Sequence, residues 1–162
     1  MTIENNVKLR LQFLARVVQR ECSHLNQTTE RLFIEPFSLE RAKKIANDEE
    51  LSERVEAFVS RFSRLQDTLG DKLIPQLLSA LGERQATAMD NLDTAERLGW
   101  IASADEWQAI RQLRNQMVHD YVEDLEILTS AIQTAQQFVP TLTDVSKKLQ
   151  AELQKRGWAR DE

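Results

Sequence analysis

The sequence predicts an all-α protein, an up-and-down bundle of about five to six helices. Apolar residues recur at spacings of three and four, and the alternation typical of strands is almost absent. Glycine and proline, at four and three residues, are too rare for a fold rich in turns. With 162 residues, 41% of them hydrophobic, the chain is long enough to bury a core as a single domain over residues 1–162.

The first long helix is expected over residues 6–29. The apolar residues that mark its buried side are Leu9, Phe13, Val17 and Leu25, with Leu14 and Val18 beside them. Pro36 then interrupts the chain, and Ser38 is placed to cap a short helix that runs through residue 46.

A third apolar stripe spans residues 51–69, and Gly70-Asp71 is expected to break the helix there. Asp71 would cap a short helix through residue 81, in which Pro75 is tolerated near the start. A fourth helix is predicted over residues 87–98, with Gly99 ending it.

Ser103 and Glu106 have the spacing of a capping box that opens a long fifth helix. We expect Pro140 to stop or kink that helix. A last amphipathic helix should follow, with its apolar side formed by Leu142, Val145, Leu149 and Leu153.

Composition excludes several classes of protein. A net charge of −5 argues against broad adhesion to nucleic acid but leaves room for a local basic cleft. The single cysteine, Cys22, excludes an intramolecular disulfide and fits a reducing compartment, where we expect it to pack as a small apolar residue. No apolar run approaches the roughly 20 residues of a membrane span, so we expect a cytoplasmic protein without a membrane partner. His24 and His119 lack metal-ligand spacing, so neither a metal nor another cofactor is expected.

Residues 114–121, RNQMVHDY, concentrate groups that suit cleavage of RNA without a metal. The imidazole of His119 can move a 2′-hydroxyl or leaving-group proton near neutral pH. The guanidinium of Arg114 can offset charge that builds on phosphate oxygens. The stretch also holds Tyr121, the one tyrosine of the chain.

Helical spacing sorts these residues onto different faces. Arg114 and Tyr121 fall inside the apolar arc of Trp107, Ile110, Leu113, Met117, Leu125, Leu128 and Ile132. An arginine there needs a partner, and the nearest acids along the sequence are Asp90, Asp93 and Glu96.

His119 lies roughly 140° around the helix from Arg114, in a stripe with Arg111 and Asn115 that should face solvent. Two arrangements would let His119 and Arg114 act together. The arginine side chain swings around the helix, or the helix lies on a two-fold axis so that two subunits line one groove. Without a shared cleft, the ordinary interpretation is a solvated histidine, a structural ion pair and a core tyrosine.

Further substrate contacts stay unassigned from the sequence. Arg54, Arg61 and Arg64 are spaced to line a strip together with Arg111, a candidate substrate-binding residue. Glutamates interleaved at Glu50, Glu53 and Glu56 favour a merely solvated helix face instead.

The motif resembles the R-x4-H-x-Y signature of HEPN domains (higher eukaryotes and prokaryotes nucleotide-binding). It is most similar to the HepT toxin branch, in which a polar residue such as Asn115 follows the arginine. The approach to the motif is similar too, from Ala95-Glu96-Arg97-Leu98-Gly99-Trp100-Ile101 through Trp107 and Ile110. The likeness covers residues 87–121 closely and the rest of the chain by helix order and length.

This resemblance implies a HEPN-like bundle that forms a homodimer with the motif helices facing each other. It implies a metal-independent RNA endonuclease with Arg114 and His119 as catalytic residues and Asn115 as a polar helper. In such type VII-like toxin–antitoxin pairs the partner is a nucleotidyltransferase that transfers AMP to the motif tyrosine, here Tyr121. Some relatives are described instead as non-catalytic substrate-binding subunits of a minimal nucleotidyltransferase.

Overall fold

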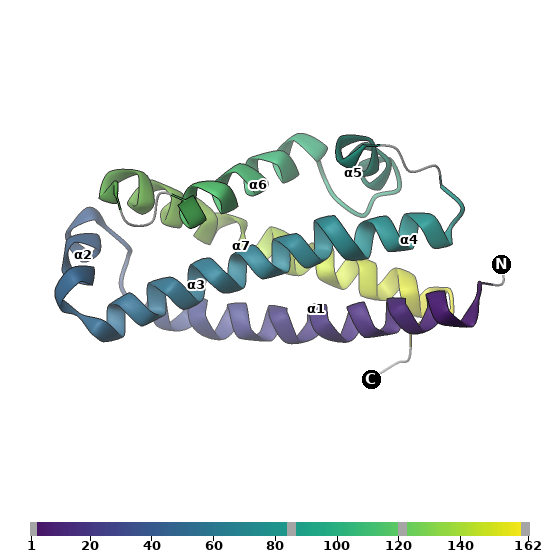
Figure 1. Ribbon diagram of the computed structural model, residues 1–162, viewed down its shortest axis with the longest axis horizontal. Helices are drawn as coiled ribbons and strands as arrows, with labels where there is room; N and C mark the ends of the chain where they lie inside the picture. The colour runs from purple at the N-terminus through teal and green to yellow at the C-terminus, as the bar shows by residue number, and fades with distance from the viewer. Residues whose placement is uncertain (1–2, 84–86, 120–122, 160–162) are drawn as a thin grey trace.

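Four long helical runs, alternating in direction, build the molecule (Figure 1). They are α1 (Asn5–Leu32), α3 (Glu49–Asp67), α6 (Ala104–His119) and α7 (Leu125–Lys155). This computed structural model describes residues 3–83, 87–119 and 123–159, and every regular element within those ranges is helical. The predicted all-α bundle is therefore confirmed.

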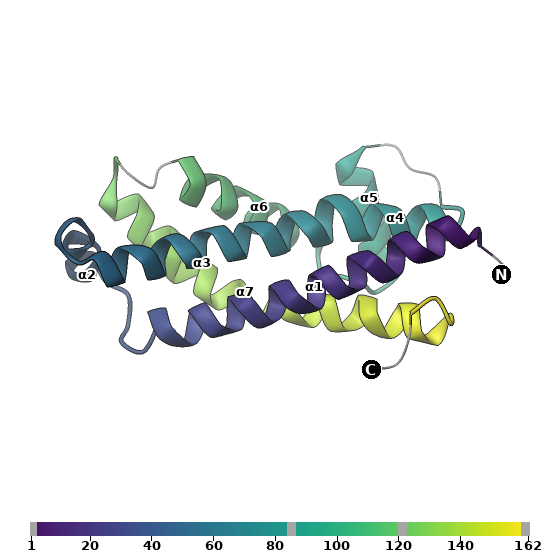
Figure 2. The same cartoon turned by 60° about the horizontal axis from the view of Figure 1, so that its bottom comes forward.

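Shorter elements connect the long helices. They are α2 (Leu39–Lys44), a 3₁₀ turn (Ile45–Asn47), a π-helical segment (Thr68–Leu73), α4 (Ile74–Ala80) and α5 (Ala88–Arg97). The α2 helix closes the end of the bundle where α7 begins (Figure 2). There the side-chain amide of Gln133 donates a 2.7 Å hydrogen bond to the Phe37 carbonyl.

Several helix ends lie where local signals predicted them. Ser38 accepts a hydrogen bond from the backbone N–H of Arg41, and Thr87 forms a capping box with Asp90. Gly99 adopts a φ of 80°, the left-handed conformation that glycine reaches at no steric cost, and α5 ends there.

The buried apolar side chains form a single cluster among the long helices. The predicted α3 stripe from Leu51 to Leu69 is buried, as are the predicted apolar residues after Pro140. On α1 the prediction was wrong for Leu9 and Phe13, which are exposed. Apolar residues occupy two adjacent arcs of α1, and α3 and α7 cover the arc of Leu11, Leu14 and Val18. No described helix is both long and apolar enough to cross a membrane.

Gly70 does not break the chain. The helix continues from α3 through the π-helical segment into α4, so the predicted break and the Asp71 cap were wrong. Gly70 serves a different purpose, because a Cβ built there would lie 2.7 Å from Nε1 of Trp107 on α6. The glycine therefore lets α6 approach this turn closely.

The predicted long fifth helix is two helices. α6 ends at His119, and Asp124 opens α7 by accepting hydrogen bonds from the backbone N–H groups of Glu126 and Ile127. Pro140 does not end α7, which continues on both sides of it. A proline removes one backbone donor, and the buried side chains that follow Pro140 hold the helix against the core.

Candidate functional site

The guanidinium of Arg114 on α6 is held by the carboxylate of Asp67, the last residue of α3. Nε donates to Oδ1 at 3.2 Å and Nη2 donates to Oδ2 at 3.0 Å, while Nη1 donates to the side-chain oxygen of Asn115 at 3.3 Å. The two paired side chains are 27% and 37% exposed, so water screens much of their attraction. The bidentate contact therefore orients Arg114 more than it stabilises the fold.

A second ion pair lies one turn earlier along α6. Nη2 of Arg111 donates to Oδ1 of Asp71, in the π-helical segment, at 2.6 Å. Together the two pairs form a ladder that joins α6 to the end of α3. Arg111, a candidate substrate-binding residue from the sequence, is thus engaged within the chain.

The partner of Arg114 was predicted wrongly. The expectation that it is paired is confirmed, but Asp90, Asp93 and Glu96 are not its partners. Asp90 closes the capping box of α5, and the carboxylate of Glu96 accepts a 2.7 Å hydrogen bond from the backbone N–H of Ala104. Proximity along the sequence misled the prediction, because α3 rather than α5 supplies the acid.

A groove between α3 and α6, with a volume of about 440 Å³, begins at the Arg114 guanidinium. We call it the α3–α6 groove. Its lining residues are Glu56, Val59, Ser60, Ser63, Arg64, Asp67, Arg114, Met117 and Val118. Sequence reasoning missed Asp67 as a partner and did not place Arg64 beside Arg114. A signal exists in retrospect: two acids four residues apart face two arginines three residues apart.

His119 and Asn115 have exposed side chains and do not line the α3–α6 groove. Because α6 remains helical through His119, the histidine and Arg114 point roughly 140° apart around the axis. The described chain therefore does not bring the two predicted catalytic side chains into one cavity. Tyr121, the predicted site of modification, lies outside the described residues.

The arginine strip that the spacing allowed along α3, as the less favoured alternative to a solvated helix face, does not form. Arg54 pairs with Glu50, and Arg61 reaches α1, where it donates to the His24 carbonyl and the Thr28 hydroxyl. Arg64 instead lines the α3–α6 groove. The three arginines of α3 thus have three different sets of neighbours.

Glu21 on α1 lies within electrostatic range of Arg64. Burial raises the pKa of the Glu21 carboxyl, and a hydrogen bond from Thr68 and the charge of Arg64 oppose that rise. One carboxylate oxygen of Glu21 is buried without a hydrogen-bond partner among the described residues. A half-buried acid whose pKa is raised by burial therefore interacts electrostatically with Arg64.

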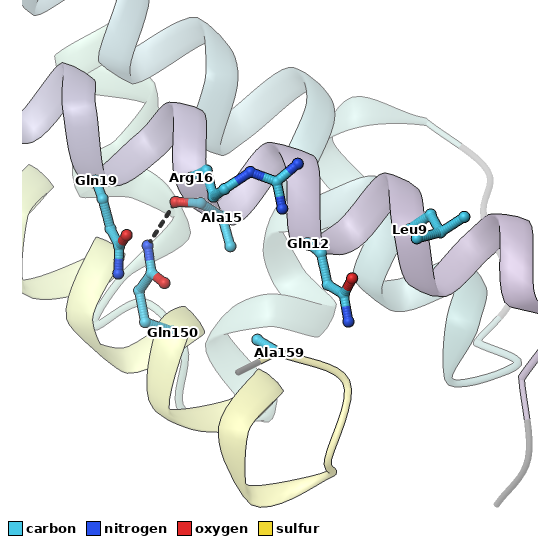
Figure 3. A pocket seen from close by; sticks show the side chains of 7 residues that line it. All are labelled: Leu9, Gln12, Ala15, Arg16, Gln19, Gln150 and Ala159. Carbon is cyan, nitrogen blue, oxygen red and sulfur yellow. Dashed lines mark hydrogen bonds between the residues drawn. The ribbon is translucent and has the colours of Figure 1, made fainter. Parts of the chain in front are cut away.

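A second cavity lies away from the motif, between α1 and the end of α7 (Figure 3). Its volume is about 360 Å³, and amides from Gln12, Gln19 and Gln150 line it with Arg16. Gln150 is committed to the fold, because it donates to the Ala15 carbonyl at 3.0 Å. None of residues 114–119, the described part of the motif, lines this cavity.

The described residues contain no group of three or more histidine, cysteine or acidic side chains placed to share a metal ion. What the candidate site offers is an oriented guanidinium at a groove and an exposed imidazole on the same helix. Comparisons with protein-family models, with curated proteins and with solved structures found no match. Function is therefore argued from these residues.

Proposed function

We propose that the protein is a metal-independent RNA endonuclease of the HEPN type, the toxin of a type VII-like toxin–antitoxin pair in the cytoplasm. The observation that carries this proposal is the fixed orientation of the Arg114 guanidinium. Asp67 and Asn115 orient its guanidinium at the mouth of a groove of about 440 Å³, and His119 is exposed five residues later. A preoriented cation and an available imidazole are what metal-free phosphodiester cleavage needs.

In the proposed reaction, the His119 imidazole takes the proton of a ribose 2′-hydroxyl. The 2′-oxygen then forms a bond to the adjacent phosphorus, the bond from phosphorus to the 5′-oxygen breaks, and the 5′-oxygen takes up the proton that the His119 imidazolium returns. The products are a 2′,3′-cyclic phosphate and a 5′-hydroxyl. Arg114 stabilises the five-coordinate state by about 3–4 kcal/mol if it acts like other preorganised charge stabilisers. Asn115 holds the guanidinium.

The active form in this proposal is a homodimer with the motif helices facing each other. The support is geometric, since within one chain Arg114 and His119 diverge around α6. A two-fold axis beside α6 would set Arg114 of one subunit opposite His119 of the partner subunit. The cognate nucleotidyltransferase would silence the toxin by transferring AMP to Tyr121, adding a negative charge that competes for the arginine.

One observation favours an alternative, a non-catalytic substrate-binding subunit of a nucleotidyltransferase. All three nitrogens of the Arg114 guanidinium already have acceptors, in Asp67 and Asn115. Three of the five N–H groups of this guanidinium are thus engaged within the chain, which also suits a purely structural or binding role.

The two functions are separated by incubating the purified chain with total RNA in EDTA. We expect fragments from the wild type and none from the H119A variant. The H24A variant is the matched control, because His24 is an exposed histidine on α1, outside the motif. Loss of cleavage in H119A but not in H24A supports the nuclease. If the wild type leaves RNA intact while mass spectrometry finds Tyr121 unmodified, the binding subunit becomes the better description.

A further inference from the structure

We propose that the α3–α6 groove binds one nucleotide of single-stranded RNA beside the cleaved bond, with its phosphate at Arg64 and Arg114. This inference rests on the proposed ribonuclease function and names its substrate site. The two arginines come from different helices and line the same groove. Of the motif residues that the structure describes, 114–119, only Arg114, Met117 and Val118 contribute to that lining.

The charges of the groove are divided between its two ends. The Arg64 side chain is exposed and forms no ion pair or hydrogen bond with the described residues, whereas Asp67 is already engaged by Arg114. Glu56 lies eight residues before Arg64, roughly 12 Å away along α3. Glu21 lies near enough to Arg64 for the charge of the arginine to lower the pKa of that carboxyl, but Glu21 does not line the groove. Within the groove lining, the end near Arg64 and Arg114 therefore holds two guanidinium groups and one carboxylate, which suits a phosphodiester group.

The wall between those ends suits a nucleoside. Val59 and Met117 are buried beneath the groove, and Val118 at its edge is 42% exposed although apolar. Ser60 and Ser63 add hydroxyl groups, of which the Ser63 hydroxyl donates to the Val59 carbonyl and keeps its lone pairs available. An apolar surface flanked by hydroxyls matches a base and ribose, and a volume of about 440 Å³ is within the range of small-ligand sites.

Single-stranded RNA is the form that fits. A base can enter a groove of this kind only when it is unstacked, and the bases of a duplex remain stacked inside it. The net charge of −5 also disfavours extensive contacts with the phosphates of a duplex. Two arginines and one apolar wall provide enough contacts to bind a single nucleotide.

Binding should be measured by fluorescence anisotropy with a labelled, short single-stranded oligoribonucleotide. Every protein in the series carries H119A, so that cleavage does not consume the probe. We expect R64Q to weaken binding on the order of tenfold and to reduce the slope of log affinity against log salt by about 0.7, the loss of one phosphate contact. R54Q is the matched control, because Arg54 is on the same helix and pairs with Glu50 away from the groove.

The apolar wall has its own pair of variants. V118A should weaken binding by roughly threefold, the loss of part of a base contact. I34A is the control, because Ile34 is an apolar side chain that is 79% exposed and does not line the groove. Both side chains are exposed, so neither truncation opens a core cavity.

The outcomes separate this site from the nuclease proposal. If R64Q and V118A bind RNA more weakly while R54Q and I34A bind as before, the result supports the groove as the RNA site. It does so even if the wild type proves unable to cleave RNA. Equal binding by R64Q and R54Q would overturn the groove even if the wild type cleaves. Tighter binding to a duplex of the same sequence would overturn the single-stranded assignment. A changed molar mass of R64Q by light scattering, with RNA binding intact, would show that the groove is a protein interface instead.

Discussion

Asp67 and Arg114 are joined through both oxygens of the carboxylate and two nitrogens of the guanidinium, although 47 residues separate them in the sequence. The pair spans α3 and α6 at the point where the α3–α6 groove begins. Arg111 and Asp71 form a similar pair one turn away, but neither of them lines that groove. The Asp71–Arg111 pair can therefore serve as a control when the contribution of the Asp67–Arg114 pair to function is tested.

We therefore expect D67N to lower RNA cleavage by about 10- to 100-fold, the range expected when a reactive group is slightly misplaced. The loss should appear in kcat, because Arg114 keeps its charge but loses a fixed orientation. D71N should change cleavage by less than about threefold, since Asp71 lies outside the groove. Both variants should unfold within about 1 kcal/mol of the wild type, as partly exposed ion pairs do.

Single-turnover kinetics and urea unfolding of the two variants check this expectation. D67E offers a rescue, because it restores the carboxylate on a longer arm. Equal activity of D67N and D71N would show that Asp67 contributes nothing beyond what any ion pair on α6 contributes.

Replacing Gly70 should destabilise the fold. In G70A the new Cβ would lie 2.7 Å from Nε1 of Trp107 and 3.2 Å from Nε2 of Gln66. Trp107 is only 1% exposed and has no room to move away. Overpacking of this kind costs about 1–3 kcal/mol of unfolding free energy, which outweighs the gain in helix propensity.

A double-mutant cycle isolates the contact between Gly70 and Trp107. The W107F variant removes the indole atoms nearest to the new Cβ, so G70A should cost at least about 1 kcal/mol less in that background. The free energies are measured by chemical denaturation. An identical cost in both backgrounds would place the strain elsewhere.

Glu21 should make stability depend on pH. Burial raises the pKa of its carboxyl above the ordinary value of 4.5, so the folded chain binds more protons than the unfolded chain in the window above that value. Stability contributed by this group is therefore greatest below pH 4.5 and falls as the pH rises through the folded pKa. The E21Q variant cannot ionise and should be more stable than the wild type at about pH 7.

Urea titrations of E21Q at a series of pH values follow this difference. The advantage should shrink as the pH falls toward about 3, where the wild-type carboxyl is almost fully protonated in both states. E53Q, at an exposed glutamate of α3, controls for the loss of one negative charge. An E21Q variant less stable than the wild type at neutral pH would mean that the Arg64 and Lys72 charges outweigh burial.

Cys22 should react slowly with thiol reagents. Burial raises the pKa of its thiol, more than a hydrogen bond to Ser146 lowers it. Since the thiolate is the reactive form, the native chain should be modified on the order of tenfold more slowly than the chain unfolded in urea. Absorbance of the released thiol chromophore gives both rates, and equal rates would show that Cys22 is accessible in the native fold.

Local patterns predicted much of this structure because their physics acts within a few residues. Ser38, Thr87 and Gly99 end or begin helices through hydrogen bonds to groups no more than four residues away. The same reasoning failed at Gly70. Local rules predict a helix break at this glycine, but a side chain from another helix lies against it and leaves no room for a Cβ.

Prediction of the candidate site was limited in the same way. The motif drew attention to Arg114 and to its need for a partner, and the exposure of His119 followed from its position on the helix. Asp67 was not considered, because its place beside Arg114 depends on how α3 packs against α6. Arg64 was indistinguishable from Arg54 and Arg61 until the structure gave each a different neighbour.

By itself, the sequence determined the all-α class, most helix ends and the divergence of Arg114 and His119 around one helix. Helix periodicity and capping set these features, and both act over a turn or two of chain. Only the tertiary structure decided which arc of α1 is buried, that Asp67 holds Arg114, and that a groove with Arg64 opens beside the pair. Those features depend on contacts between helices, and the sequence pattern of one helix does not specify which other helix packs against it.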